Sequence, residues 1–253
     1  MRTLWPPGDQ ELSDEDLEAL YMPPERRHLR ANFVLSLDGA AEFDGRSHGL
    51  ATADDTRVFK ILRAVSDVVL VGATTARRED YGPALIPEPR RRRRLARGQS
   101  PQPPVAVVTA RGDLDPHSRL FSGRQTAGYV APLVFVGQGI AADRRRALEQ
   151  VAEVTVCRGE RASMTEVVGA LWRRGLRRVL CEGGPTLVSE LLARGLVDEL
   201  CLTHTTVIAG PGRAILTAGV PFAELLHLDL QLLIGGDGAL LGRYAVIGKE
   251  PEK

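Results

Sequence analysis

The residue types best suited to binding a nucleotide follow the apolar run that ends at Cys181. Next come Glu182, the pair Gly183-Gly184, and then Pro185-Thr186. Glycine lets a ligand approach the backbone closely, and proline fits the first position of a helix whose free N–H groups attract an anion. The pattern therefore indicates a strand-to-helix turn that could bind a diphosphate. A plain Gly-Pro turn between a strand and a helix explains the same residues equally well.

Two more predicted strand ends carry polar residues of the kind that nucleotide sites use. Gly72 precedes Thr74 and Thr75, whose hydroxyls could bind a phosphate, a ribose or a carboxamide, although Thr74 as a helix N-cap is the simpler interpretation. Asp38-Gly39 ends another apolar stretch, and Asp-Gly is also a common turn. Because parallel α/β sheets bind ligands at the carboxyl ends of their strands, we expect these segments to lie at one edge of the sheet.

Asp55 is the candidate for acid–base chemistry. It is the fourth residue of Thr52-Ala53-Asp54-Asp55, a capping-box pattern that has a structural purpose at the start of a helix. The same position also directs a carboxylate toward the predicted mouth of the sheet, where it could bind a polar heterocycle or relay a proton. Arg63 lies two turns later on the same predicted helix.

The motifs of several enzyme classes are absent from the sequence. No predicted strand is followed by G-x-G-x-x-G, and there is no G-x-x-x-x-G-K-[ST] phosphate loop. The five histidines are scattered, with no H-E-x-x-H and no H-x-E paired with P-C-x-x-C, so we predict no metal site. A G-x-S-x-G nucleophile turn is also missing. These absences argue against P-loop kinases, zinc deaminases and serine hydrolases.

The composition of the 253 residues limits the class of protein further. Thirty-three basic and 32 acidic side chains leave a formal net charge of +1, and only 5% of the residues are aromatic, which argues against nucleic-acid and anionic-membrane partners. Only three of the basic residues are lysines, and the arginine excess is best explained by the composition of the genome. Cys157, Cys181 and Cys201 lie far apart in or beside apolar runs, which predicts buried free thiols. Because no apolar export signal or membrane span is found, we expect a cytoplasmic protein.

Hydrophobic periodicity predicts alternating strands and helices. Strands are expected at 31–36, 67–71, 105–109, 133–136, 153–157, 178–181, 199–207, 225–234 and 239–247, and helices at 14–20, 54–66, 142–151, 164–174 and 187–195. The last three strands have no helices between them, and the glycine-rich segment 235–238 predicts a hairpin. We therefore predict an α/β fold with a mixed, mostly parallel sheet, helices on both faces and an antiparallel C-terminal hairpin.

The chain is expected to form one domain with an appendage. Residues 1–28 are predicted to be an N-terminal arm that covers part of the surface, and residues 29–253 a single domain. Within that domain, residues 83–104 contain several prolines and the arginine run 90–94, which predicts an exposed loop.

Three segments together resemble a known family. They are Asn32 to Gly39, Leu62 to Thr75, and Cys181-Glu182-Gly183-Gly184-Pro185-Thr186-Leu187 with the later Gly195-Leu196-Val197-Asp198-Glu199-Leu200. They resemble the reductase domain of riboflavin biosynthesis, which is the C-terminal half of bacterial bifunctional pyrimidine deaminase/reductases and has a dihydrofolate-reductase-like fold. The resemblance runs from about Leu29 to Ile247, and it is strongest to the stand-alone actinobacterial reductases of this family.

The resemblance implies an NADPH-dependent oxidoreductase that forms a homodimer and acts on a small molecule. The family reaction passes a hydride from NADPH to 5-amino-6-(5-phosphoribosylamino)uracil and opens its ribose to a ribityl chain. The protein supplies orientation and electrostatics. The positions implied to contact the cofactor are Thr75, Glu79, Thr109, Arg111, Gly183, Gly184, Pro185, Thr186 and Leu187, with Arg111 a candidate for the 2′-phosphate. Those implied to contact the substrate are Ser47, Arg63 and Glu182, and Asp55, or a water that it holds, is implied to supply the proton.

Two departures from the family pattern lie on the substrate side. Ser47 is followed by His48-Gly49-Leu50-Ala51 in place of the usual aromatic residue and Ile-Thr, and the segment 79–83 has no counterpart of a substrate-binding arginine. Two other functions therefore stay open. One is a reductase of dihydrofolate or another pterin with the same fold, and the other is a protein that binds NADPH without catalysis.

Overall fold

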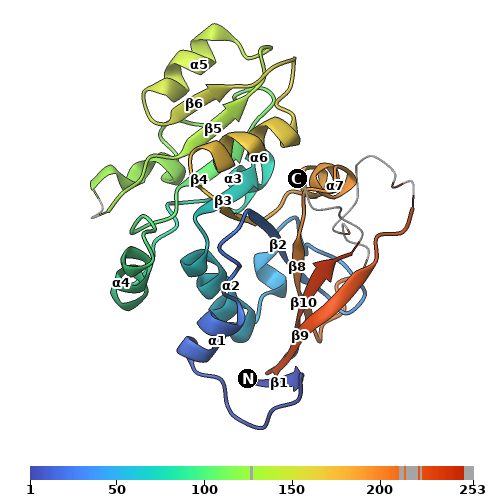
Figure 1. The fold of residues 1–253 in the computed structure, drawn as a ribbon. Coiled ribbons are helices and arrows are strands. Elements are labelled where there is room, and N and C mark those ends of the chain that lie inside the picture. The colour runs from blue at the N-terminus through green and yellow to red at the C-terminus, as the bar shows by residue number, and fades with distance from the viewer. Residues whose placement is uncertain (126–127, 211–213, 215–221, 223, 248–253) are drawn as a thin grey trace.

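A single mixed sheet of ten strands organises the molecule, in the order β1-β9-β10-β8-β2-β7-β3-β4-β5-β6 (Figure 1). The computed structural model describes all residues except 126–127, 211–213, 215–221, 223 and 248–253. Statements about its structure below refer to the described residues.

The larger part of the sheet is parallel. Its parallel strands are β2 (His28–Leu35), β3 (Val68–Gly72), β4 (Val105–Val108), β5 (Leu133–Val136), β6 (Glu153–Val156), β7 (Arg178–Cys181) and β8 (Glu199–Thr205). Beyond β8, the hairpin of β9 (Leu228–Gly236) and β10 (Ala239–Val246) and the strand β1 (Arg2–Trp5) continue the sheet in antiparallel pairings. The predicted mixed, mostly parallel sheet with an antiparallel C-terminal hairpin is confirmed.

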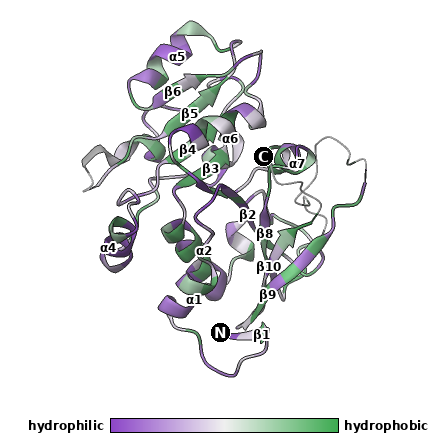
Figure 2. Cartoon of the chain, viewed as in Figure 1, coloured by the Kyte–Doolittle hydropathy of each residue, from purple (hydrophilic) through white to green (hydrophobic). Residues whose placement is uncertain are grey.

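Helices cover both faces of this sheet, because its central strands are apolar on both sides. In β3, Val69 and Val71 pack in one hydrophobic cluster while Val68 and Leu70 pack in the other. The first cluster includes residues of α1 (Asp14–Leu20), α2 (Ala53–Val65), α3 (Ala73–Arg78) and α5 (Ala142–Glu149), and the second includes residues of α6 (Met164–Arg173) and α7 (Pro185–Ala193). The strands β3, β4 and β5 are mostly green in the hydropathy colouring (Figure 2), as expected for strands that are buried on both faces. Two 3₁₀ helices, η1 (His48–Leu50) and η2 (Arg119–Gln125), lie in the connections.

The three cysteines are buried and free, as the sequence predicts. Burial raises the pKa of the Cys181 and Cys201 thiols to about 12, so both stay protonated at neutral pH.

The N-terminal segment does more than cover the surface. β1 pairs with β9 at the edge of the sheet, and Leu17 of α1 is fully buried in the first hydrophobic cluster. The Ser13 hydroxyl accepts a hydrogen bond from the amide of Asp16, whose carboxylate accepts from Ser13 in return, so a complete capping box starts α1. Whether residues 1–28 are a separable unit stays a prediction.

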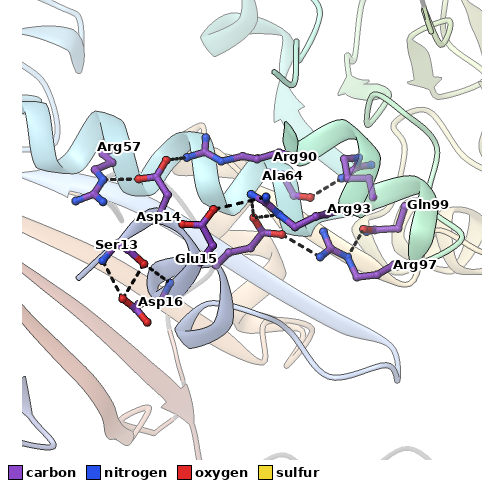
Figure 3. Close-up of polar contacts among 12 residues, drawn as sticks. Ser13, Asp14, Glu15, Asp16, Arg57, Ala64, Arg90, Arg93, Arg97 and Gln99 are labelled. Carbon is purple, nitrogen blue, oxygen red and sulfur yellow. Dashed lines mark hydrogen bonds and ion pairs between the residues drawn. The ribbon is translucent and has the colours of Figure 1, made fainter. Parts of the chain in front are cut away.

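The predicted exposed loop at 83–104 is wrong for its central part. Residues Glu88–Ala96 form the helix α4, and Arg90 and Arg94 are buried. The reason is that arginines of this helix and of its C-cap pair with carboxylates on α1 (Figure 3). Glu18 accepts hydrogen bonds from Arg93 at 2.8 Å and from Arg97 at 2.9 Å, and Asp14 bridges Arg57 and Arg90. The charge run therefore joins two helices instead of facing water.

Arg94 is the most deeply buried of these arginines, with no exposed surface. Its guanidinium donates to four backbone carbonyls, those of Arg63 (3.3 Å), Ala64 (2.9 Å), Ser66 (2.6 Å) and Ser100 (2.9 Å). Three of these carbonyls lie at the C-terminal end of α2, on Arg63, Ala64 and the C-cap residue Ser66, where a cation also complements the helix dipole. Burial lowers the pKa of Arg94 to about 10, which still leaves it charged at neutral pH.

We expect Arg94→Met to lower the free energy of unfolding by about 2–4 kcal/mol, because it leaves buried carbonyls without a donor. The matched control is Arg92→Met on the same helix, where the side chain is 78% exposed and pairs only with Glu88. That change is expected to stay within about 0.5 kcal/mol. Urea unfolding measures both; equal losses in the two variants would contradict the structural role of Arg94.

Candidate active site

A cleft of about 880 Å³ opens at the carboxyl ends of β3, β4 and β7. This is the edge at which parallel α/β sheets bind ligands. Its lining includes eleven of the thirteen residues that the sequence analysis singled out: Ser47, Thr75, Glu79, Thr109, Arg111, Glu182, Gly183, Gly184, Pro185, Thr186 and Leu187. The sequence therefore located the cleft, although the role of each residue stays a prediction. Arg63 and Asp55 are not part of the lining.

The turn before α7 has the conformation that its glycines allow. Gly183 and Gly184 both have positive φ, at 106° and 50°. The carbonyl of Gly183 accepts a hydrogen bond from the amide of Gly72 at 3.0 Å, which holds the turn beside the end of β3. No side chain caps the start of α7, so its first amides face the cleft without a side-chain acceptor. A helix start of this kind can bind a phosphate group.

Thr75 lies directly against this turn. A Cβ placed on Gly184 would be 3.0 Å from the Thr75 hydroxyl, which is tighter than an ordinary van der Waals contact. The helix α3 begins at Ala73 with Gly72 as its N-cap and no side-chain cap. The simpler interpretation of Thr74 as that N-cap is therefore wrong, because the helix starts one residue earlier, and Thr74 lines the cleft instead.

Arg63 and Glu182 bind each other. The Nε and Nη2 atoms of Arg63 donate to the two carboxylate oxygens of Glu182 at 2.7 and 2.6 Å, a bidentate pair. The Glu182 side chain is only 1% exposed. The guanidinium also stacks 4.3 Å from the ring centre of Phe59. Burial lowers the pKa of Arg63, but the Glu182 carboxylate outweighs that effect and the net shift is upward.

Tyr81 completes this cluster and was not predicted from the sequence. Its hydroxyl donates to Oε2 of Glu182 at 2.8 Å. Burial raises the pKa of Tyr81 well above its usual range, and the Glu182 carboxylate adds to the shift, so the phenol stays a donor. Tyr81 lies in the segment where the family pattern breaks, and no spacing rule in the sequence links it to a residue 101 positions away.

Ser47 and Glu79 form a second pair across the cleft wall. The amide and the hydroxyl of Ser47 both donate to Oε1 of Glu79, at 2.8 and 3.1 Å. Ser47 belongs to the connection between β2 and α2, and Glu79 caps the end of α3. The pair ties that connection to α3. Ser47, which the resemblance implies to contact the substrate, is thus hydrogen-bonded to Glu79, which it implies to contact the cofactor.

The end of β4 carries two further predicted residues. The Thr109 hydroxyl donates to Asp113 at 2.9 Å, and Asp113 also pairs with Arg77 at 2.8 Å. Burial raises the pKa of Asp113, but the Thr109 hydrogen bond and Arg77 outweigh it, so the carboxylate stays ionised. Arg111 is exposed on the cleft. Arg161, which follows β6, lines the cleft too and was missed because it belongs to no motif.

Asp55 lies in the first turn of α2, where its amide donates to the Thr52 hydroxyl at 3.2 Å. The capping prediction is confirmed for this backbone bond. The side chain is buried and accepts a hydrogen bond from the Thr203 hydroxyl of β8. Burial raises the pKa of Asp55 and the Thr203 hydrogen bond opposes part of that shift. The carboxyl group is therefore a candidate to hold a proton, although the structure does not bring it into the cleft lining.

In the described ranges of the chain, no group of three His, Cys, Asp or Glu side chains could hold a metal ion. None of the helices in those ranges has the length and apolar character needed to cross a bilayer.

The "RibD C-terminal domain" family model matches residues 27–234. The chain belongs to this family. A curated relative from Archaeoglobus fulgidus, named 2,5-diamino-6-ribosylamino-4(3H)-pyrimidinone 5′-phosphate reductase, is 28% identical over 87% of this chain and 99% of its own length. "Riboflavin biosynthesis protein RibD" of Mycobacterium tuberculosis is also 28% identical, but the match covers 76% of this chain and only 46% of that protein.

A solved structure of similar sequence supports the fold. The pyrimidine reductase-like protein from Corynebacterium diphtheriae superposes with a TM-score of 0.79 at 29% identity, over 88% of this chain and 93% of that one. The sequence-based resemblance to riboflavin-biosynthesis reductases is confirmed.

We expect Gly184→Val to weaken NADPH binding about tenfold or more. The new side chain would contact Thr75 and occupy the space in front of the α7 amides, where the diphosphate is expected to bind. The control is Gly195→Val at the other end of α7. Gly195 also has positive φ, at 62°, but a Cβ there meets nothing within 4 Å. Both variants carry backbone strain, so only the first should change the dissociation constant measured by calorimetry. Unchanged affinity in Gly184→Val would refute the placement of the diphosphate.

We expect Tyr81→Phe to raise the KM for the pyrimidine substrate about 3- to 10-fold with little effect on the NADPH dissociation constant, because it removes one charge-assisted hydrogen bond that orients Glu182. Tyr244→Phe on β10, outside the cleft lining, is the control. A Tyr81→Phe enzyme with an unchanged KM, or with weakened NADPH binding instead, would show that Tyr81 does not position the substrate.

Proposed function

We propose that this chain is an NADPH-dependent reductase that acts on the ribosylamino-pyrimidine 5′-phosphate of riboflavin biosynthesis in the cytoplasm. The observation that carries the proposal is the position of Glu182. This buried carboxylate immediately precedes the Gly183-Gly184 turn, so a group that binds a heterocycle adjoins a helix start that binds a diphosphate. A reductase needs its substrate ring and its cofactor side by side.

NADPH supplies the hydride when it is bound, and the protein's own groups bind and orient the reactants. The amides at the start of α7 and the Thr75 hydroxyl are suited to the diphosphate. Glu182, locked by Arg63 and Tyr81, can only accept hydrogen bonds, so it is suited to the N–H groups of a pyrimidine. Ser47 offers a hydroxyl at the mouth of the cleft.

The Glu182 carboxylate, which can only accept hydrogen bonds, also favours one of two possible pyrimidine substrates over the other. The sequence resemblance implies the uracil compound, whereas the relative that matches along its full length is named for the 2,5-diamino-pyrimidinone. The diamino compound carries an amino group where the uracil carries a carbonyl. An ionised carboxylate accepts from the former and repels the latter. We therefore place the diamino compound first and keep the uracil compound as the second substrate.

The test is an assay of purified protein with NADPH and one acceptor at a time: the diamino-pyrimidinone phosphate, the aminouracil phosphate and dihydrofolate. NADPH oxidation with a pyrimidine phosphate is expected. Oxidation with dihydrofolate alone would replace the proposal by a pterin reductase, and tight NADPH binding without turnover on any of the three would indicate a non-catalytic binding protein.

We also propose a homodimer. The leucines Leu225, Leu226 and Leu228 are exposed beside Leu192 and Leu200 in one groove, and a second copy of the chain would cover such apolar surface. A molar mass near 27.5 kDa by light scattering, the mass of one chain, would contradict this.

We expect Asp55→Asn to lower kcat about 100-fold or more if Asp55 holds the proton that accompanies the hydride. The raised pKa sets the sign of the pH dependence: activity that needs the protonated acid is lost as pH rises through the folded-state pKa. Stability follows the same direction, because ionising a buried carboxyl group disfavours the fold. The Asn variant should therefore melt at or above the wild-type temperature at pH 8.

Asp54→Asn is the matched control for Asp55→Asn. Both carboxylates are in the first turn of α2, but Asp54 accepts from the amide of Asp237 in the β9–β10 hairpin at 2.9 Å. Replacing the Asp54 carboxylate should therefore lower the stability of the fold and leave kcat unchanged. If both variants keep full activity, Asp55 has only a structural role.

A further inference from the structure

Two arginines without an ion-pair partner among the described residues line the same end of the cleft. Arg111 follows β4 and Arg161 follows β6, and both are exposed. In the strand order these positions lie beyond β3, on the side away from β7 and Glu182. The other two arginines of the lining differ from them, since Arg77 pairs with Asp113 and Arg78 lies 3.8 Å from Glu42.

The backbone brings Arg161 toward Arg111 across the end of β5. Gly137 is the first residue after β5, and a Cβ there would collide with the carbonyl of Glu160 and lie 2.6 Å from Cα of Arg161. Only glycine lets the segment after β6 cross so closely. The amide of Thr109 donates to the carbonyl of Phe135 at 3.0 Å, so the end of β4 flanks β5 on its other side. The two arginines thus approach the cleft from either side of one strand end.

Carboxylates in this lining are already hydrogen-bonded. Asp113 is held by Thr109 and Arg77, and Glu190 accepts from Arg194 at 3.1 Å. The charge of the two guanidinium groups is therefore left for a ligand. A guanidinium donates two parallel hydrogen bonds to phosphate oxygens, which makes a pair of free arginines a site for a phosphomonoester dianion.

We propose that Arg161 acts together with Arg111 to bind the 2′-phosphate of NADPH and so selects NADPH over NADH. The proposal rests on the proposed function for the presence of a dinucleotide in the cleft. Arg161 belongs to no sequence motif, and the choice between NADPH and NADH would depend on the segments that follow β4 and β6. NADH has a neutral hydroxyl at the same position and gains nothing from the second charge.

The experiment measures binding by calorimetry, without pyrimidine and without turnover. The ligands are NADPH, NADH, 2′,5′-ADP, 5′-AMP and inorganic phosphate, and the proteins are wild type, Arg161→Gln, Arg111→Gln, the double variant and the control Arg92→Gln on α4. Each single variant at the cleft is expected to weaken NADPH and 2′,5′-ADP about 10- to 100-fold and to leave NADH and 5′-AMP unchanged, because one charge-assisted interaction is lost. Arg92→Gln should behave as wild type.

Further arms separate the proposal from its rivals. If both arginines hold one phosphate, the losses in the double variant are expected to be non-additive, and the preference for 2′,5′-ADP should shrink as salt is raised. Equal weakening of NADPH and NADH in Arg161→Gln, or no weakening of either, would overturn the proposal. Tight binding of inorganic phosphate, together with equal affinities for 2′,5′-ADP and 5′-AMP, would also overturn it. Wild-type protein that prefers NADPH but reduces no pyrimidine would refute the proposed function and leave this site intact.

Discussion

The bidentate ion pair between Arg63 and Glu182 connects the elements that form the cleft. Glu182 directly follows β7, its amide donates to the carbonyl of Leu70 at 3.0 Å, and the next residue begins the turn into α7. The Glu182 side chain is only 1% exposed, and removing one partner of such a buried pair typically costs about 3–5 kcal/mol. The pair therefore ties α2, on one face of the sheet, to the start of α7, on the other.

The position of Arg63 depends in turn on the charged helices far from the cleft. Arg94 of α4 donates to the carbonyls of Arg63, Ala64 and Ser66 and so fixes the end of α2. α4 is held to α1 through Glu18, which binds Arg93 and Arg97 (Figure 3). Exposed pairs contribute little to stability, but here the carboxylate of Glu18 is 5% exposed and serves two cations at once. The arginine run that composition seemed to explain has a structural use at these positions.

Local rules predicted the parts of the molecule that depend on a few neighbouring residues. The positive φ angles of Gly183 and Gly184 and the helix that starts at Pro185 follow from a Gly-Gly-Pro sequence after an apolar strand. The same rules failed where partners are distant in the chain. The sequence near residues 90–94 does not show that carboxylates of α1 will pair with these arginines, so local rules predict a solvated loop there. A capping pattern likewise fixes where α2 starts but not that Asp55 turns toward Thr203, outside the cleft lining.

The two halves of the cleft are built by different means, and this explains why the departures from the family pattern gather in one of them. The half proposed to bind the cofactor relies on backbone amides and glycines, whose geometry most side-chain substitutions nearby leave unchanged. The half proposed to bind the substrate relies on side chains that hydrogen-bond to one another, Ser47 with Glu79 and Glu182 with Arg63 and Tyr81. A change of one partner there alters the direction of the other without moving the sheet. Tyr81 illustrates this, because a single hydroxyl adds a third hydrogen bond to Glu182 and leaves the turn that follows it in place. Substrate preference can thus vary within this fold while the proposed dinucleotide site keeps its shape.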